Sequence, residues 1–592
     1  NETITLPLKT GYNYNFQVDW GDGTTVDTIT SFNQAEATHT YASAGSHTVT
    51  MTGLAEAWSF NNGGDKLKIT SVTDFGDLGW IDLAGAFSGC TNLTAFAGGN
   101  TATVTDMFTM FAGASSLTSL DLSNFDTALV TDMSAMFYGA SGLTSLDLSS
   151  FDTALVTDMS YMFFGASGLT SLDLTSFNTA AVTNMYQMFG ITSSLTSLDL
   201  SNFNTAAVTN MGSMFNGASS LTSLDLSSFD TALVTDMSYM FHNASNLTSL
   251  DLSNFNTAAV TNMSYMFAGG ASGLTTLDLS SFNTAKVTNM GYMFRDASGL
   301  TSLDLSNFNT AAVANMSSMF RGASGLTSLD LSSFNTAAVT TMGSMFYNAT
   351  NLTSLDLSSF NTAAVTNMGS MFVGASGLTS LDLSSFNTSL VTNMSSMFYN
   401  ATSLTSLDLS SFNTAAVTNM SRMFYNASSL TSLNLSSFNT AAVTDMYRMF
   451  YNASSLTSLD LSSFDTTLVT NMDSMFNGAT GLTSLDLSSF NTAAVTSMSY
   501  MFQNTGSLLT LNVIGWDISG ALGTDVFQST NPALIVYCDQ GGSVGTGSFF
   551  GKPCDGAFIS TWQTTAPNET ITLPLKTGYN YNFQVDWGDG TT

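Results

Sequence analysis

Hydrophobic residues recur along most of the chain with a period of 26 residues. The first full copy begins at Leu117, which we take as position 1 of the repeat, and the consensus reads LTSLDLSSFNTAAVTNMSSMFYGASG. Fifteen copies fill residues 117–507, with one extra residue in the stretch Ala268-Gly269-Gly270. A unit this short can bury its hydrophobic side chains only by stacking on its neighbours, so the pattern predicts a solenoid.

Two segments of each repeat are expected to be regular. Leucines at positions 1, 4 and 6 indicate a short strand with an inward face. Met133, Met136 and Phe137 have the i, i+3, i+4 spacing of a short amphipathic helical turn. Thr131 and Asp132 precede that turn and are suitable caps. The expected fold is an α/β repeat solenoid of leucine-rich-repeat type, with a parallel sheet and short helical turns.

The first 54 residues follow a different pattern. Apolar side chains alternate with polar ones over 12–18, which indicates a strand, and Gly-Asp-Gly at 21–23 indicates a turn. We therefore expect an all-β sandwich over 1–54. Asp19 and Asp22 are candidate calcium ligands, although a purely structural turn is the simpler interpretation.

The composition narrows the classes of partner. Only 9% of the residues are charged, against ~25% in an average domain, and the net charge is −32. Such a surface disfavours nucleic acid and anionic membranes, and it favours divalent cations or basic partners. No apolar run approaches the ~20 residues of a membrane-spanning helix, so we expect no membrane insertion within this segment.

Aspartate occupies position 5 in 14 of the 15 repeats, and Asn434 is the exception. Carboxylates stacked at ~4.8 Å repel by about 0.9 kcal/mol even in bulk water. Bound cations, raised pKa values or hydrogen bonds from Ser and Thr would relieve this repulsion, and we favour the hydrogen bonds. Calcium is the one candidate cofactor. The candidate metal strip comprises Asp121, Asp147, Asp173, Asp199, Asp225, Asp251, Asp278, Asp304, Asp330, Asp356, Asp382, Asp408, Asp460 and Asp486.

Variation between repeats is concentrated at positions 19 and 22, where all four arginines and many tyrosines lie. Arg and Tyr are favoured at protein contacts. An ordinary solvated face is the alternative for any single residue. As a cluster, the candidate interface on the solenoid comprises Tyr399, Tyr425, Tyr451, Arg422 and Arg448.

The segments beside the repeats are expected to close the solenoid. Residues 55–116 read as an N-terminal cap with divergent repeats, and 508–557 as a C-terminal cap. Cys538 and Cys554 are expected to form a disulfide in that cap, which suits an exported protein. Cys90 takes the place of a buried alanine and is expected to be a free core thiol.

Residues 1–25 recur without change at 568–592, which marks the chain as one unit of a tandem array. Residues 558–592 are therefore interpreted as the start of the next sandwich. The strand-like Phe558, Ile559 and Trp562 form a second candidate interface, because they would complete the sandwich of the following unit. The join is either covalent or made by strand donation.

The run LTSLDLSSFNTAAVTNMSSMF resembles the 26-residue repeat of bacterial surface proteins, a BspA-like branch of the leucine-rich repeats. The resemblance covers roughly Trp58 to Cys554. FQVDWGDG at 16–23, with HTY at 39–41 and SHTVT at 46–50, resembles a PKD-type β-sandwich. The repeat family implies an extracellular or cell-surface location, often adhesion, and no enzymatic activity.

We expect no enzyme, because the chain has only 3 histidines and lacks a nucleophile elbow, a phosphate loop and a His-x-x-x-His motif. Two functions are kept open. In the first, the chain is an extracellular structural unit that joins head to tail with copies of itself into a surface fibre or stalk. In the second, it is a cell-surface adhesin that binds a glycan, a surface or a protein through the solenoid.

Overall fold

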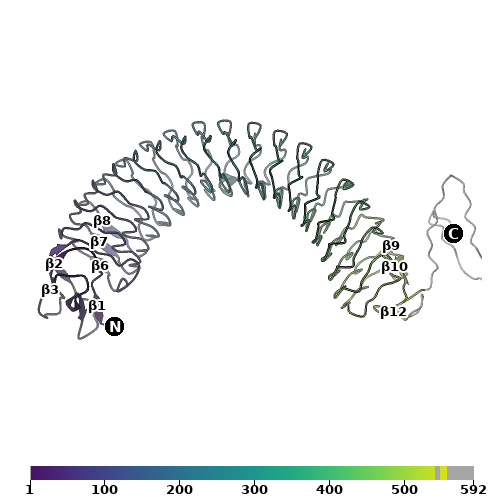
Figure 1. The fold of residues 1–592 in the computed structure, drawn as a ribbon, viewed down its shortest axis with the longest axis horizontal. Helices are drawn as coiled ribbons and strands as arrows, with labels where there is room; N and C mark the ends of the chain where they lie inside the picture. Colours follow the sequence, from purple (N-terminus) through teal and green to yellow (C-terminus); the bar gives the residue numbers. More distant parts are fainter. Residues whose placement is uncertain (1, 540–546, 556–592) are drawn as a thin grey trace, which may run out of the picture.

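A computed structural model describes residues 2–539 and 547–555. Each repeat forms one coil, and the stacked coils bend into an arc with the N-terminal sandwich at one end and the C-terminal cap at the other (Figure 1). The side chains that recur at the hydrophobic positions of the repeat form one continuous core through the whole arc.

The N-terminal sandwich consists of two antiparallel sheets. In β2, Tyr14, Phe16 and Val18 point into the core and alternate with exposed residues, as a strand with one buried face requires. The smaller sheet pairs β1 (Thr3–Thr5) with β4 (Thr38–Thr40), which follows a short 3₁₀ turn, η1 (Ala35–Ala37). The larger has the order β3 (Asp27–Ile29), β2 (Tyr14–Asp19), β5 (Thr50–Ala55).

This sandwich is attached directly to the first coil of the solenoid. Lys9 Nζ forms an ion pair with Asp82 at 2.5 Å, and the Tyr12 hydroxyl donates to the same carboxylate. The Tyr14 hydroxyl donates to the Ala57 carbonyl at 3.2 Å. Ala57 in turn pairs in parallel with Asp82, the first of a series of bridges that continues from coil to coil. The sandwich therefore covers the open end of the stack.

The predicted helical turn of the repeat does not form, so the interpretation as an α/β solenoid is wrong. In the first full repeat Ala135 and Gly139 have φ angles of 54° and 64°. The same left-handed conformation recurs at positions 19 and 23 of all fifteen repeats, and a right-handed helix cannot contain it. The Met-x-x-Met-Phe spacing instead places these side chains in the core from a series of tight turns.

We call this segment, positions 17 to 24 of each coil, the turn ladder. Its backbone N–H groups alternate between two kinds of partner. Phe137 donates to Met162 of the next coil at 2.9 Å, while Tyr138 donates back to Ala135 at 3.1 Å. Both sets of bonds repeat along the arc, so the turn ladder joins neighbouring coils by direct backbone hydrogen bonds.

The predicted parallel sheet forms only near the two ends of the solenoid. In the coils between, few direct bonds join the strand segments, such as that from Thr170 N to Thr144 O at 3.2 Å. The N-terminal sheet contains β6 (Ser71–Val72), β7 (Ala95–Ala97) and β8 (Ser119–Asp121). The C-terminal sheet contains β9 (Ser484–Asp486), β10 (Thr510–Asn512) and β11 (Ile535–Tyr537).

The spacing between equivalent rings explains both the arc and the missing sheet. Stacked tyrosines on the turn ladder, such as Tyr399 and Tyr425, have centroids 4.4 Å apart. The core rings at position 21 are 5.6–5.9 Å apart, and Phe438 and Phe464 at position 9 are 6.4 Å apart. The turn ladder is therefore the concave side. The opposite side is wider than the ~4.8 Å that sheet hydrogen bonds need.

Side chains bridge the coils on this wide side. Every buried threonine at position 11 donates its hydroxyl to a carbonyl of the next coil, as Thr388 does to Asn413 O at 2.8 Å. Most of these hydroxyls also accept the N–H of the same residue, here Asn413 N at 2.8 Å. Most serines at position 8 reach back one coil, as Ser150 does to Leu122 O at 3.0 Å. We call the position-11 residues the threonine ladder.

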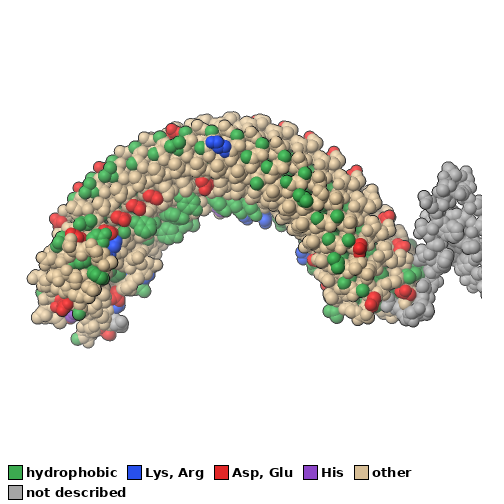
Figure 2. All heavy atoms as spheres, in the orientation of Figure 1, with side chains coloured by type: hydrophobic (Ala, Val, Ile, Leu, Met, Phe, Trp, Pro, Cys, Tyr) green, Lys and Arg blue, Asp and Glu red, His purple; other side chains and the backbone are tan. Residues whose placement is uncertain are grey.

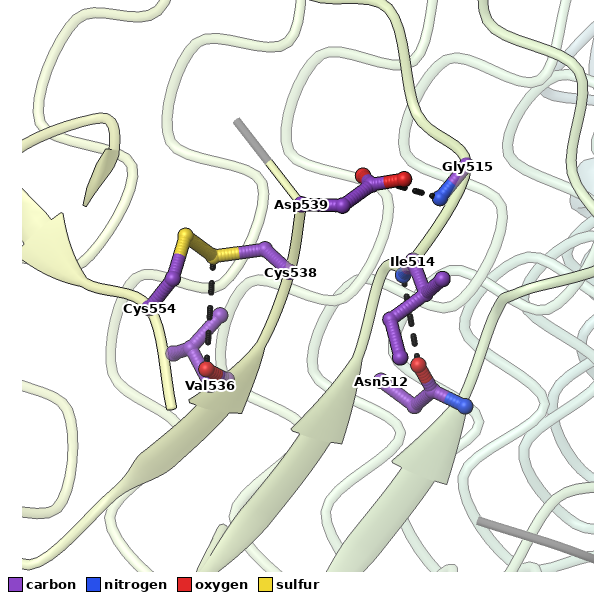
Figure 3. The surroundings of a disulfide bond; sticks show 7 residues. All are labelled: Asn512, Ile514, Gly515, Val536, Cys538, Asp539 and Cys554. Carbon is purple, nitrogen blue, oxygen red and sulfur yellow. Dashed lines mark hydrogen bonds between the residues drawn. A yellow bond between two sulfur atoms is a disulfide. The ribbon is translucent and has the colours of Figure 1, made fainter. Parts of the chain in front are cut away.

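The single-residue insertion and the C-terminus are accommodated locally. The insertion forms a 3₁₀ turn, η2 (Gly270–Ser272). After the last coils, β12 (Ser548–Phe549) and β13 (Lys552–Pro553) form a small antiparallel hairpin. A disulfide joins Cys538, at the end of β11, to Cys554 after β13 (Figure 3). Cys90 is a fully buried free thiol.

Candidate interaction surfaces

The concave side carries the chain's arginines and most of its exposed aromatic residues. Positions 19 and 22 flank the core residues of the turn ladder, so their side chains leave the core on the concave side. Figure 2 shows hydrophobic patches and basic side chains along this edge, whereas acidic side chains are scattered over the convex edge and one flank. The two sides of the arc therefore differ in chemistry.

Near the C-terminal end of this face lies the predicted solenoid interface. Tyr399, Tyr425 and Tyr451 stack face to face with centroids 4.4 and 4.5 Å apart. Arg422 and Arg448 place their guanidinium carbons 4.7 and 4.8 Å from the ring centre of Tyr447. All five predicted residues thus belong to one half-buried cluster, which we call the Tyr–Arg cluster together with Tyr447.

Tyr447 was missed by the sequence reasoning, although it holds the two arginines together. It occupies position 18, where most repeats have Ser or Gly. The unusual size of the residue was the only available signal. A second arginine–tyrosine pair, Arg321 over Tyr347 at 4.5 Å, lies four coils earlier at position 22.

The Asp strip lies on the wide side of the coils and is exposed. Each carboxylate closes a turn, as in Asp304, where Oδ1 accepts the Ser306 N–H at 2.9 Å. Hydrogen bonds from the Ser306 N–H and hydroxyl lower the pKa of Asp304, and the opposing effect of the neighbouring carboxylates Asp278 and Asp330 is smaller. The same cause lowers the pKa along the strip from Asp121 to Asp460. Hydrogen bonding is thus sufficient to keep the strip ionised.

This arrangement predicts how stability depends on pH. A carboxylate whose pKa is lower in the folded state stabilises the fold above its unfolded pKa of ~3.9 and loses that contribution as pH falls through the folded value. We therefore expect the contribution of the strip to the melting temperature to stay nearly constant from pH 7 to about 5. Below pH 4 the melting temperature should fall steeply. Thermal melts against pH check this. In the double variant Asp304→Asn, Asp356→Asn the melting temperature should fall less steeply below pH 4. An identical fall would contradict the role given to these carboxylates.

In the sandwich, Asp19 and Asp22 are held by protein groups. Asp19 Oδ1 accepts the Gly21 N–H at 2.9 Å. Asp22 Oδ1 accepts the N–H and the hydroxyl of Thr24, and Oδ2 lies 2.8 Å from His39 Nε2. Hydrogen bonds from Thr24 and then His39 lower the pKa of Asp22 to about 2. Within the described residues, no group of three or more His, Cys, Asp or Glu side chains is arranged to hold a metal ion.

Two further predictions concern the ends of the chain and membranes. Phe558, Ile559 and Trp562, with the remainder of 558–592, lie outside the described residues. Over the part of the chain that the structure covers, no helix has the length and apolar character needed to span a bilayer.

Comparison with known proteins identifies both parts of the chain. A model of the PKD domain matches residues 1–64. The family described as "Mycoplasma protein of unknown function, DUF285" matches 81–197, 167–275, 192–298, 270–380, 325–432, 349–458 and 430–532. No curated protein matches the chain.

Two solved structures align with part of the chain at low identity. A leucine-rich repeat protein from Eubacterium ventriosum has 16% identity and a TM-score of 0.33, covering 60% of this chain and 97% of its own. A chain of the Drosophila Toll–Spatzle complex has 15% identity and a TM-score of 0.18, covering 76% and 56%. These identities and TM-scores are too low to carry a functional argument. The DUF285 matches together span residues 81–532, well over half of the chain, so this protein belongs to the DUF285 family of repeat proteins and carries a PKD domain at its N-terminal end.

Proposed function

We propose that this chain is a structural unit of an extracellular or cell-surface array, joined head to tail to further units through its sandwich domain. The repeat family and the PKD domain together suggest a cell-surface repeat protein. The observation that supports joining is the recurrence of residues 1–25 at 568–592. In the first copy these residues supply β1 and β2, which belong to the domain seated on the first coil.

The geometry of the two ends supports this role. An uncovered coil exposes unpaired backbone groups and apolar side chains, which invites uncontrolled stacking. Here the sandwich covers the first coil and the disulfide-linked cap closes the last ones. Covered ends favour contacts between units through dedicated end domains over open-ended stacking of coils. A disulfide in the cap also suits an oxidising compartment.

The uniformity of the solenoid favours a structural over a catalytic role. The outward strand positions repeat Ser-Asp-Ser with little change, and the carboxylates there are occupied in turn formation. Catalysis needs a small number of precisely placed groups in a pocket, and repeating coils offer none that is unlike its neighbours. We propose a non-enzymatic protein on this basis.

Electron microscopy of the purified chain tests the proposal. We expect arcs connected end to end, at a spacing of one arc, and isolated arcs from a shortened chain that stops at Asp555 and so lacks the second copy of the sandwich sequence. A parallel preparation with a calcium chelator tells whether assembly needs the cation. Isolated arcs from the 592-residue chain at every concentration would contradict joining by strand donation. A continuous two-unit chain in which the two arcs take no fixed angle to each other would contradict joining through the sandwich domain.

A further inference from the structure

The Tyr–Arg cluster contains basic groups with no acidic partner. Arg295 is paired with Asp296 at 3.0 Å. Within the described residues, the guanidinium groups of Arg321, Arg422 and Arg448 form neither an ion pair nor a hydrogen bond. This is unusual in a chain with 42 acidic residues and 10 basic ones, where a carboxylate is readily available to most cations.

Arg448 shows the need for a partner most directly. Its Nε atom is buried and has no hydrogen-bond acceptor. A buried donor without a partner costs about 1–3 kcal/mol, so such groups are usually satisfied by a ligand or water. Its guanidinium lies 5.2 Å from the ring centre of Tyr451 as well as 4.8 Å from that of Tyr447. Nε itself is enclosed, so the terminal N–H groups of the guanidinium, which are not buried and have no partner, are the ones left to bind an oxyanion.

The groups beside the arginines are polar and periodic. Each stacked tyrosine is followed by an asparagine, and Asn426 Nδ2 donates to Asn400 Oδ1 at 3.0 Å. The tyrosine rings cover one another's faces, so edges and hydroxyls are what they offer to a partner. Identical hydrogen-bonding groups repeated from coil to coil match a ligand that is itself periodic and rich in hydroxyls. An unrelated protein surface would instead need a unique apolar centre.

We propose that the Tyr–Arg cluster binds an anionic polysaccharide, whose carboxylate or sulfate groups are held by Arg422 and Arg448 and whose hydroxyls bond to the Tyr–Asn row. Charge selects this ligand over a neutral glycan. Planar guanidinium groups bind carboxylate and sulfate through two parallel hydrogen bonds, which a hydroxyl cannot match. Two carboxylates close to the arginines accept hydrogen bonds from other groups: Asp445 from the Tyr447 N–H, and Asp473 from Ser497 and Ser499. Screening over about 8 Å at physiological ionic strength weakens the repulsion from more distant acidic residues.

Binding of the full chain to three immobilised polymers tests this proposal: polygalacturonate for carboxylates, dextran sulfate for sulfates, and unmodified dextran as the neutral control. We expect binding to one or both polyanions, weakened at about 0.5 M NaCl, and little binding to dextran. Preference between the two polyanions identifies the acidic group. Equal binding to all three polymers, or no binding to either polyanion, would overturn the proposal.

Variants locate the site. Arg448→Gln and Arg422→Gln are each expected to weaken binding about tenfold, in line with the loss of one charge-assisted contact. Lys286→Gln removes one positive charge at an exposed position 13 and serves as the matched control, with unchanged affinity expected. Arg448→Lys should recover only part of the affinity, because it restores charge without the planar fork. Thermal melts confirm that each variant is folded. Equal affinity in both glutamine variants and the control would contradict binding of the polyanion by Arg422 and Arg448.

Discussion

Replacing Phe424 with alanine is expected to destabilise the coils around this residue by about 3–5 kcal/mol. The ring is fully buried and stacks on Phe398 and Phe450 at 5.7 and 5.6 Å, so its removal leaves a cavity between three coils. Each coil contacts only its neighbours, so the loss cannot be shared along the whole arc. We therefore expect unfolding to separate into two steps, with the coils around Phe424 unfolding first.

Limited proteolysis and hydrogen exchange measure this directly. The variant should be cut within 398–450 under conditions that leave the original chain intact, and amides in that region should lose protection before those near either end. Ser406→Ala, at an exposed position of the same coil, is the control and should behave like the original chain. A variant that keeps a single unfolding step at the original midpoint would show that stability is shared over many coils.

Thr388→Val tests the threonine ladder and is expected to cost about 1–3 kcal/mol, because it removes two hydrogen bonds to the backbone of Asn413, an exposed residue, at about 0.5–1.5 kcal/mol each. The hydroxyl of Thr388 donates to Asn413 O and accepts from Asn413 N, both at 2.8 Å. Valine has nearly the same shape, so no cavity accompanies the change. The residue is fully buried, and water cannot easily replace the hydroxyl.

Urea denaturation compares Thr388→Val with Thr388→Ser. Serine keeps both hydrogen bonds and loses one methyl group, which is worth about 1 kcal/mol. We expect the valine variant to be the less stable of the two. If serine were as costly as valine, the ladder would contribute through packing and its hydrogen bonds would have little net effect.

The stacking of coils and the identity of the core residues could be predicted from the sequence, because periodic burial depends only on spacing. The conformation of the turn ladder could not. Met133, Met136 and Phe137 reach the core equally well from a helical turn and from turns with left-handed residues, so their spacing does not distinguish the two. The better signal was position 23, where Gly and Asn, the residues that tolerate positive φ, are common.

The curvature also could not be predicted from the hydrophobic pattern, since it depends on how polar groups connect the coils. Thr127 and its equivalents recur at a buried position, which indicates an obligatory hydrogen bond, but not the direction or length of the bridge. The Tyr–Arg cluster was identified because the repeats vary there. Its arrangement around Tyr447 could not be predicted, because contacts between coils depend on their register in three dimensions.

Because the coils are closer together on the inner edge of the arc than on the outer edge, the arc should respond elastically to force. Its inner edge is already at contact distance, with rings at 4.4 Å, while the outer edge, at 6.4 Å, has room to close. Tension applied at the two ends would therefore straighten the molecule by drawing the outer strands together toward sheet spacing, as β9 and β10 already are. Such straightening would strain the side-chain bridges of the outer edge and leave the backbone bonds of the turn ladder in place. A fibre built from such units would lengthen under load and recoil when released.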